Sequence, residues 1–281
     1  MIDLKDVRIV TDSSADLWGI EGITVAQAPL KIRTDKKEYV DDAALDVSAM
    51  NEDLRRYKGK SGTSCPSMGD FLAAFGDAKY IFCITMTAKL SATHGVALSA
   101  ARAYEEENPD RRVCVIDSRN TGPGMKLIAE RIAALLHEGL AFDEICTRVQ
   151  AYREENELLF LLESLTNLAN NGRVSRAVAL LAGLLGVRML GRAVQGVIDP
   201  VAKPRGEKKA LDATWQKMQE LGYCGGKVRI SHNENEAAAQ AVCDAVRAKY
   251  PEADVEIYPA RALCSFYAER GGIILGFEVK K

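Results

Sequence analysis

Short apolar runs alternate with amphipathic stretches along the first half of the chain. Runs at residues 7–10, 80–84 and 113–116 are rich in β-branched or aromatic side chains, which is typical of buried strands. Each run is followed by a polar or small-residue loop, and helical patterns occupy residues 91–104 and 126–137. This repetition predicts a parallel α/β sheet. Ligands bind at the carboxyl ends of such strands, where Asp12, Thr85 and Asp117 fall.

The pattern changes after a helical stretch at residues 142–155 and a strand at residues 158–162. Residues 177–185 are apolar on all sides, which predicts a buried helix, and Gln195-Gly196 predicts a hairpin turn within residues 192–201. Further on, helices are expected at residues 208–221 and 234–249, and strands at residues 228–231, 255–258 and 273–277. We therefore expect a parallel-sheet α/β domain at residues 1–163 and a smaller mixed α/β sandwich at residues 164–281.

Composition excludes several classes of protein. The chain has 281 residues, of which 47% are hydrophobic and 27% charged, and its formal charge of −2 provides no general attraction to nucleic acid or anionic lipid. No apolar run reaches the roughly 20 residues of a membrane-spanning helix, and no targeting peptide is evident, so a cytoplasmic protein is expected. Seven dispersed cysteines and three histidines indicate neither a disulfide framework nor a metal site, and we expect no metal or cofactor.

Three loops carry hydroxyl groups directly after or between predicted elements. They are VTDSSADL at residues 10–17, TSCPS at residues 63–67 and KLSAT at residues 89–93. Each can direct hydroxyls and backbone amides at an anion, and each can equally cap the helix that follows. The loop DSRNTGPG at residues 117–124 matches neither nucleotide-binding glycine motif, so a tight turn explains its glycines.

Two further hypotheses concern a catalytic serine and basic residues that could bind an anion. Ser91 with His94 as base would suit a serine hydrolase, but the sequence has no G-x-S-x-G elbow and no obvious acid to orient the imidazole. Arg173, just before the apolar helix, suits a carboxylate or phosphate at the mouth of an apolar cavity, or is simply solvated. The basic cluster at residues 203–209 is typical of an exposed hairpin end.

Taken jointly and in order, these segments resemble the DegV family, the bacterial fatty-acid-binding proteins that include the FakB subunits of fatty acid kinase. VTDSSADL resembles the opening signature of that family, TSCPS its T-S-x-P-S loop and KLSAT its L-S-G-T loop. VIDS follows at residues 115–118, then NGRVS at residues 171–175, similar to G-G-R-I-S, and VAKPRG at residues 201–206, similar to the family's hairpin. The resemblance covers nearly the whole chain.

The resemblance implies a fatty acid in a tunnel between two α/β domains, with its carboxylate held by Thr63 and Ser91. Ser64 and Ala92, beside them, are included in this carboxylate site, and Arg173 is placed at the carboxylate opening. Leu180, Leu184 and Leu185 are expected in the tunnel wall. The family usually carries H-T-G-P-G near its end, whereas this chain has FYAERGG at residues 266–272, so Tyr267 takes the position of the family histidine. Ala92 likewise replaces the glycine of L-S-G-T.

The leading interpretation is a non-catalytic lipid carrier that presents a fatty acid to a separate kinase, a step implied by the resemblance. Arg173, Lys203 and Arg205 are the candidate surface for docking that kinase. An alternative is a hydrolase or transferase that acts on an acyl or phosphorylated substrate through Ser91 or Ser64. A third possibility is that the changes around Tyr267 select another apolar ligand. A bound fatty acid without turnover favours the carrier, and covalent labelling of Ser91 favours the enzyme.

Overall fold

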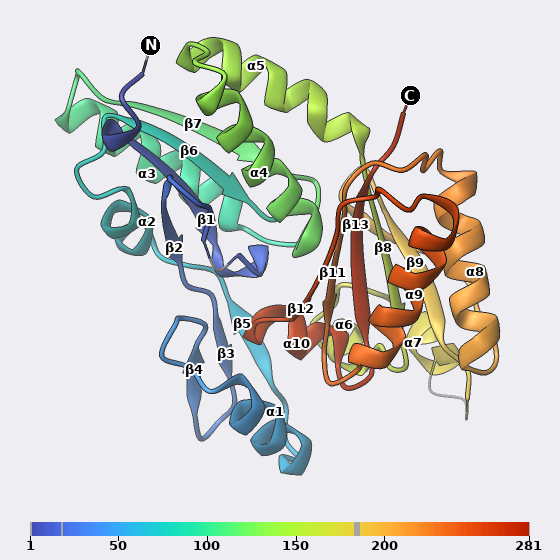
Figure 1. The fold of residues 1–281 in the computed structure, drawn as a ribbon. Helices are drawn as coiled ribbons and strands as arrows, with labels where there is room; N and C mark the ends of the chain where they lie inside the picture. Colours follow the sequence, from blue (N-terminus) through green and yellow to red (C-terminus); the bar gives the residue numbers. More distant parts are fainter. Residues whose placement is uncertain (1, 18, 183–185, 281) are drawn as a thin grey trace.

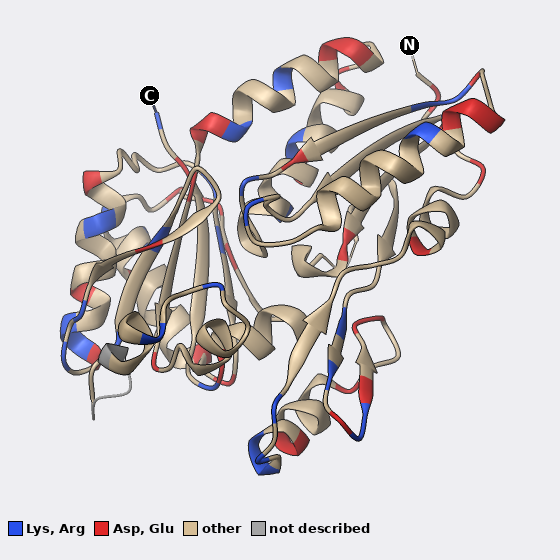
Figure 2. Cartoon of the chain, turned by 180° about the vertical axis from the view of Figure 1, so that it is seen from behind, with Lys and Arg blue, Asp and Glu red and all other residues tan. Residues whose placement is uncertain are grey.

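The computed structural model describes residues 2–17, 19–182 and 186–280. Within these ranges the strands form a four-stranded sheet, a six-stranded sheet and a small three-stranded sheet, which occupy separate parts of the molecule (Figure 1). Basic and acidic residues are interspersed along the ribbon (Figure 2), in keeping with the small net charge. No helix in the described ranges is long and apolar enough to cross a membrane.

The four-stranded sheet has the order β2-β1-β6-β7 and is parallel throughout. Its strands are β1 (Val7–Asp12), β2 (Thr24–Ala28), β6 (Tyr80–Thr85) and β7 (Arg112–Asp117). One face packs against α2 (Met68–Phe75) and α3 (Thr93–Glu107), and the other against α4 (Pro123–His137) and α5 (Phe142–Tyr152). Alternation along the strands explains both cores, because Phe82 and Ile84 face α4 and α5 while Ile81 and Cys83 face α2 and α3.

The six-stranded sheet has the order β10-β9-β8-β13-β11-β12. Its strands are β8 (Asn156–Leu162), β9 (Met189–Val194), β10 (Val197–Ala202), β11 (Val228–His232), β12 (Val255–Pro259) and β13 (Ile273–Glu278). All pairings except β11 with β12 are antiparallel. One face is covered by α8 (Glu207–Glu220) and α9 (Glu236–Lys249), which pack on Leu159, Leu161 and Leu275. The opposite face turns toward the first sheet and its helices.

A small antiparallel sheet lies below the other two in the view of Figure 1. It consists of β3 (Lys31–Arg33), β4 (Glu38–Val40) and β5 (Gly62–Ser64), with α1 (Val47–Arg56) beside it. Ile32, Tyr39 and Met50 form its core together with Ala262 and Phe266 of α10 (Ala262–Ala268). Helix α10 therefore connects the small sheet with the six-stranded one. The remaining short elements are α6 (Thr166–Asn170), α7 (Arg176–Ala182) and the 3-10 turns Leu4–Asp6, Ser13–Ala15 and Arg153–Glu155.

Helix α4 is buried between the two large sheets. Its residues Ile128 and Ile132 belong to the core of the first sheet, while its first turn abuts β13. The approach is so close that a Cβ on Gly276 would lie 2.7 Å from the backbone nitrogen of Gly124 and 2.7 Å from the carbonyl carbon of Pro123. Glycine at this position of β13 therefore permits the two halves of the chain to meet.

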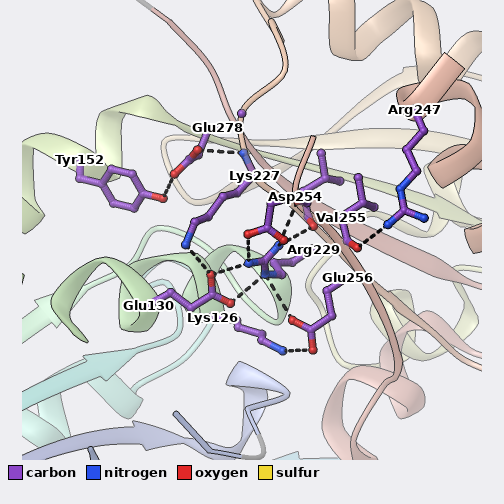
Figure 3. A network of polar contacts seen from close by, with 12 residues as sticks. Lys126, Glu130, Tyr152, Lys227, Arg229, Arg247, Asp254, Val255, Glu256 and Glu278 are labelled. Carbon is purple, nitrogen blue, oxygen red and sulfur yellow. Dashed lines mark hydrogen bonds and ion pairs between the residues drawn. The ribbon is translucent and has the colours of Figure 1, made fainter. Parts of the chain in front are cut away.

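Ion pairs join the same helix to the far strands of the second sheet (Figure 3). Arg229 of β11, buried at 5% exposure, binds Glu130 of α4 through two contacts of 2.7 and 2.8 Å, and its Nη2 also lies 2.8 Å from Asp254. Lys126 of α4 lies 2.6 Å from Glu256 of β12. The helix is thus held by backbone contact at its start and by charged side chains along its length.

Gly276→Ala is expected to lower the free energy of unfolding by about 1–3 kcal/mol, because the added methyl group meets backbone that cannot rotate away. Urea denaturation measures this change. Gly95→Ala in α3 is the matched control, since its Cβ would have no neighbour within 4 Å and alanine favours a helix by about 1 kcal/mol. Equal stability of the two variants would contradict the close packing at Gly276.

The predicted fold class is confirmed: the three strands predicted in the first half are parallel, and the Gln195-Gly196 turn forms, with positive φ at both residues. The fourth strand of that sheet, β2, was not predicted. The predicted burial of residues 177–185 is wrong for Leu180, which is 75% exposed on α7. Leu184 and Leu185 lie outside the described residues. Strand β8 pairs with β9 and β13, so the change of sheet precedes Asn156, and the domain division after residue 163 stays a prediction.

Candidate functional site

An apolar cavity lies between the six-stranded sheet and the loops of the first sheet. It encloses about 940 Å³, its open mouth included. The second sheet contributes one wall, made of Leu158, Phe160, Leu162, Ala193, Ile198 and Ile274. Leu30, Met86 and Leu90 of the first half and Leu263 of α10 form the opposite side. This predominantly apolar lining suits a long apolar ligand.

Polar side chains meet at one part of this lining. The hydroxyl oxygens of Thr63 on β5 and Tyr267 on α10 lie 2.7 Å apart, although 204 positions separate them in the chain. The guanidinium of Arg173 lies 5.7 Å from the centre of the Tyr267 ring. Ser91 lines the same cavity. The cluster of Thr63, Ser91, Arg173 and Tyr267, here called the polar cluster, offers hydroxyl donors beside a cation, which suits a carboxylate.

Local folding explains how each member is positioned. Thr63 pairs with Ile32 in the small sheet, and because strand side chains alternate, Thr63 and Cys65 face the cavity while Ser64 does not. Arg173 follows α6 and donates hydrogen bonds to two carbonyl groups. Its Nη1 donates to the Asn171 carbonyl (2.6 Å), and its Nε donates to the Leu90 carbonyl (3.3 Å). Its side chain is therefore oriented before any ligand arrives.

Burial raises the pKa of the Tyr267 phenol, and the Thr63 hydroxyl and the Arg173 cation oppose that rise. The phenol consequently stays protonated near neutral pH and can donate its hydrogen to a carboxylate. Tyr267 also packs against Phe266, with ring centroids 4.9 Å apart, so the ring cannot swing freely. By the resemblance, this neutral donor with a fixed ring takes the position at which the family usually carries an ionisable histidine.

The Ser91 and His94 side chains do not form a nucleophile–base pair. Ser91 Oγ lies 2.8 Å from Thr93 Oγ1, whereas His94 Nδ1 lies 3.0 Å from Thr85 Oγ1. A serine hydrolase needs a hydrogen bond between nucleophile and base. The arrangement therefore does not support Ser91 as an activated nucleophile.

Several predicted site residues lie elsewhere. Ser64 and Ala92 are not part of the cavity lining, so their predicted contact with a carboxylate is not supported by their positions. Leu180, expected in the tunnel wall, points into solvent. Lys203 and Arg205 are exposed on the connection between β10 and α8 and do not line the cavity. In the part of the chain that the structure describes, no group of three or more His, Cys, Asp or Glu residues could hold a metal ion.

Sequence reasoning missed a group of three fully buried carboxylates behind the cavity. Asp12 Oδ2 accepts a hydrogen bond from the amide of Met86 (2.7 Å), and Asp16 Oδ1 accepts one from the amide of Arg261 (2.8 Å). Asp41 accepts the amide of Leu263 (3.1 Å) at the start of α10. Each carboxylate thus fixes the backbone of a segment that forms the cavity wall or adjoins it.

Burial dominates the acid–base behaviour of these carboxylates. It raises the pKa of Asp12 to about 6, although the Ser14 hydroxyl and two backbone amides oppose the rise. It raises the pKa of Asp16 to about 7, with Asp41 adding to the effect and the Arg261 amide opposing it. The pKa of Asp41 is raised as well, by burial, against the attraction of the Arg261 cation. In the sequence, the segment VTDSSADL contains Asp12 and Asp16, but helix capping was the simpler interpretation of it.

Residues 6–279 match the family model described as "Uncharacterised protein, DegV family". A DegV domain-containing protein of Streptococcus pneumoniae, spr0652, is 37% identical over 277 residues, which cover 97% of this chain and 99% of that protein. A DegV domain-containing protein of Streptococcus gordonii is 36% identical over the same length, with the same coverage.

Two solved structures are similar over nearly their whole length. A DegV family protein from Eubacterium eligens loaded with heptadecanoic acid is 43% identical, with a TM-score of 0.96 that covers 98% of this chain and 100% of that chain. The Fatty Acid Kinase (Fak) B3 protein of Streptococcus pneumoniae loaded with linoleic acid is 36% identical, with a TM-score of 0.95 that covers 98% and 99% respectively.

Proposed function

The chain belongs to the DegV family, and we propose that it binds one long-chain fatty acid and presents the carboxyl group to a separate fatty acid kinase, without catalysing a reaction itself. The observation that carries this proposal is the apolar cavity with the polar cluster at its lining. The Eubacterium and Streptococcus structures that hold fatty acids are similar over almost the whole chain, which supports the same ligand class here. A cytoplasmic location stays a prediction.

Apolar burial supplies the affinity in this proposal. Each buried methylene contributes about 0.8 kcal/mol, so a chain of roughly 16 carbons contributes on the order of 10 kcal/mol before entropic losses. The carboxylate needs few contacts, provided that its oxygens are not buried without hydrogen bonds. Thr63, Ser91 and Tyr267 would donate hydrogen bonds, and Arg173 would balance the negative charge.

We assign kinase docking to three basic side chains, those of Arg173, Lys203 and Arg205. Arg173 reaches the cavity, and Lys203 and Arg205 are exposed. An acidic surface on the kinase would be steered toward such cations, and the effect would weaken with added salt. Charge reversal at Lys203 and Arg205 should then slow association with the kinase while leaving fatty-acid binding unchanged.

Native mass spectrometry of freshly purified protein tests the proposal. We expect an added mass in the fatty-acid range that organic solvent releases and gas chromatography identifies. Protein without a bound lipid that also fails to bind added palmitic acid would refute the proposal. Turnover of acyl esters that disappears in Ser91→Ala would instead support an enzyme.

Thr63→Ala and Ser91→Ala are each expected to weaken fatty-acid binding by about 1–3 kcal/mol, because a charged acceptor loses a hydrogen-bond donor. Calorimetric titration with palmitic acid measures the loss, and circular dichroism checks that the variants fold. Ser99→Ala is the matched control, since Ser99 is exposed on α3 and donates to the Gly95 carbonyl of its own helix. Wild-type affinity in the Thr63→Ala, Ser91→Ala double variant would place the carboxylate elsewhere.

A further inference from the structure

Alternate residues of β8 form a row along the wall of the cavity. Leu158, Phe160 and Leu162 line the cavity, and Asn156 is the next member of the row because strand side chains alternate. Leu162 packs in one cluster with Leu168, whose carbonyl accepts the amide of Arg173 (2.8 Å), so this end of the row adjoins the polar cluster. Six residues at roughly 3.3 Å each put Asn156 about 20 Å away, at the far end.

Asn156 is a buried amide whose polar atoms are unpaired. It is 8% exposed, and neither Nδ2 nor Oδ1 has a hydrogen-bond partner among the described residues. Asn120, which lines the cavity from the loop after β7, is 5% exposed, and its Oδ1 is likewise unpaired within the described ranges. Buried side-chain amides in folded proteins are nearly always hydrogen-bonded, so two such residues at one end of a cavity require an explanation.

Asn120 and Asn156 face the same space. A second pocket of about 490 Å³, open solvent included, is lined by both and shares Leu158, Ala193 and Gly196 with the apolar cavity. Charged side chains also line it: Arg119, Arg153, Glu154, Glu157 and Arg192. Arg119 closes this pocket toward the β9–β10 turn through a 2.8 Å hydrogen bond to Gln195. The apolar cavity therefore borders a polar compartment at the end opposite to the polar cluster.

We propose that this compartment receives a polar group carried near the ω end of the acyl chain, so that the ligands include long-chain fatty acids with a terminal or near-terminal hydroxyl or keto oxygen. The proposal rests on the fatty-acid binding proposed above. A hydroxyl can accept a hydrogen bond from Asn156 Nδ2 and donate one to an amide oxygen, whereas a methyl group leaves both amides unsatisfied. A site that hydrogen-bonds a ligand oxygen binds that ligand in preference to the analogue without it.

The test compares palmitic acid with ω-hydroxypalmitic acid on the full chain, before and after Asn156→Leu. In the wild type we expect ω-hydroxypalmitic acid to bind at least as tightly as palmitic acid, despite the cost of burying its hydroxyl. In Asn156→Leu the ratio of the two dissociation constants should shift about tenfold toward palmitic acid. Leucine has a similar shape and removes an unsatisfied amide, so the variant is expected to fold.

Asn108→Leu is the matched control, because Asn108 lies at the end of α3, donates a hydrogen bond to the Tyr104 carbonyl (2.9 Å) and lines neither pocket. It should leave the ligand ratio unchanged. An equal ratio in wild type and Asn156→Leu, or a wild type that strongly prefers palmitic acid, would overturn the inference and leave the proposed function standing. Failure of both fatty acids to bind the wild type would refute the proposed function itself, and the inference with it.

Discussion

Replacing Arg229 by methionine is expected to lower the free energy of unfolding by about 3–5 kcal/mol. The substitution removes the cation of a buried ion pair, so the Glu130 carboxylate stays beneath the second sheet without its Arg229 partner. The Arg229 side chain is 6% exposed and that of Glu130 is 15% exposed. Arg229 Nε also lies 3.4 Å from Glu256, so the substitution removes the charge shared by three carboxylates. Methionine preserves the apolar volume of the side chain, so the loss reports the charge and its hydrogen bonds.

Arg247→Met, in the same view of Figure 3, is the matched control for this prediction. Arg247 is exposed on α9, and its Nη2 makes a 3.4 Å hydrogen bond to the Val255 carbonyl. Its replacement should change stability by no more than about 0.5 kcal/mol. Urea denaturation followed by circular dichroism measures both variants. If Arg229→Met were as stable as Arg247→Met, the charged network would not be what holds α4 to β11.

Asp16→Asn is expected to remove a pH dependence of stability worth up to about 4 kcal/mol. The pKa of Asp16 is raised from 3.8 to about 7 in the folded protein, so the folded state holds this proton more tightly than the unfolded chain. Below the ordinary pKa both states are protonated, and the contribution to stability is complete. As pH rises toward 7 the unfolded chain releases the proton first, and stability falls by about 1.4 kcal/mol for each pH unit.

The comparison of Asp16→Asn with wild type isolates this carboxylate. Asp12 and Asp41, whose pKa values are also raised, are present in both proteins, so their contributions cancel to first order. Asparagine suits the position because Asp16 has a φ of 51°, and its amide oxygen can still accept the Arg261 amide.

The stability difference, variant minus wild type, should increase from about pH 4 to about pH 7 and then level off. Urea denaturation at several pH values measures it. Asp110→Asn, at an exposed turn, controls for the loss of one negative charge. A difference that stays constant across this range would mean that Asp16 is ionised throughout.

Most of the two large sheets was predictable because their strands and helices have strong periodicity, but β2, whose residues are mostly only partly buried, was not predicted. Residues 80–84 and 126–137 have the apolar spacing of a buried strand and an amphipathic helix, and both elements form with shifts of one to three residues at their ends. The members of the polar cluster could also be predicted, because the order of the loops matched a known family. The contact between Thr63 and Tyr267, which are 204 positions apart, could not be predicted.

The missed elements are short or depend on tertiary contacts. Strands β3, β4 and β5 have three residues each, which is too few for an alternating pattern to stand out. The start of helix α10 is fixed by a hydrogen bond to Asp41, which lies so far from α10 in the sequence that the contact could not be predicted. The exposure of Leu180 could not be read from an all-apolar segment, because composition predicts burial whereas a short surface helix leaves one side uncovered.

A helix enclosed by two sheets limits how the molecule can move. Because α4 belongs to the core of the first sheet and its first turn touches the backbone of Gly276 in the second, rotating one sheet away from the other would break this packing. A hinge motion that separates the two sheets is therefore too costly in free energy to accompany each binding and release of a ligand. We therefore expect a ligand to enter and leave through rearrangement of the short segments at the cavity edge.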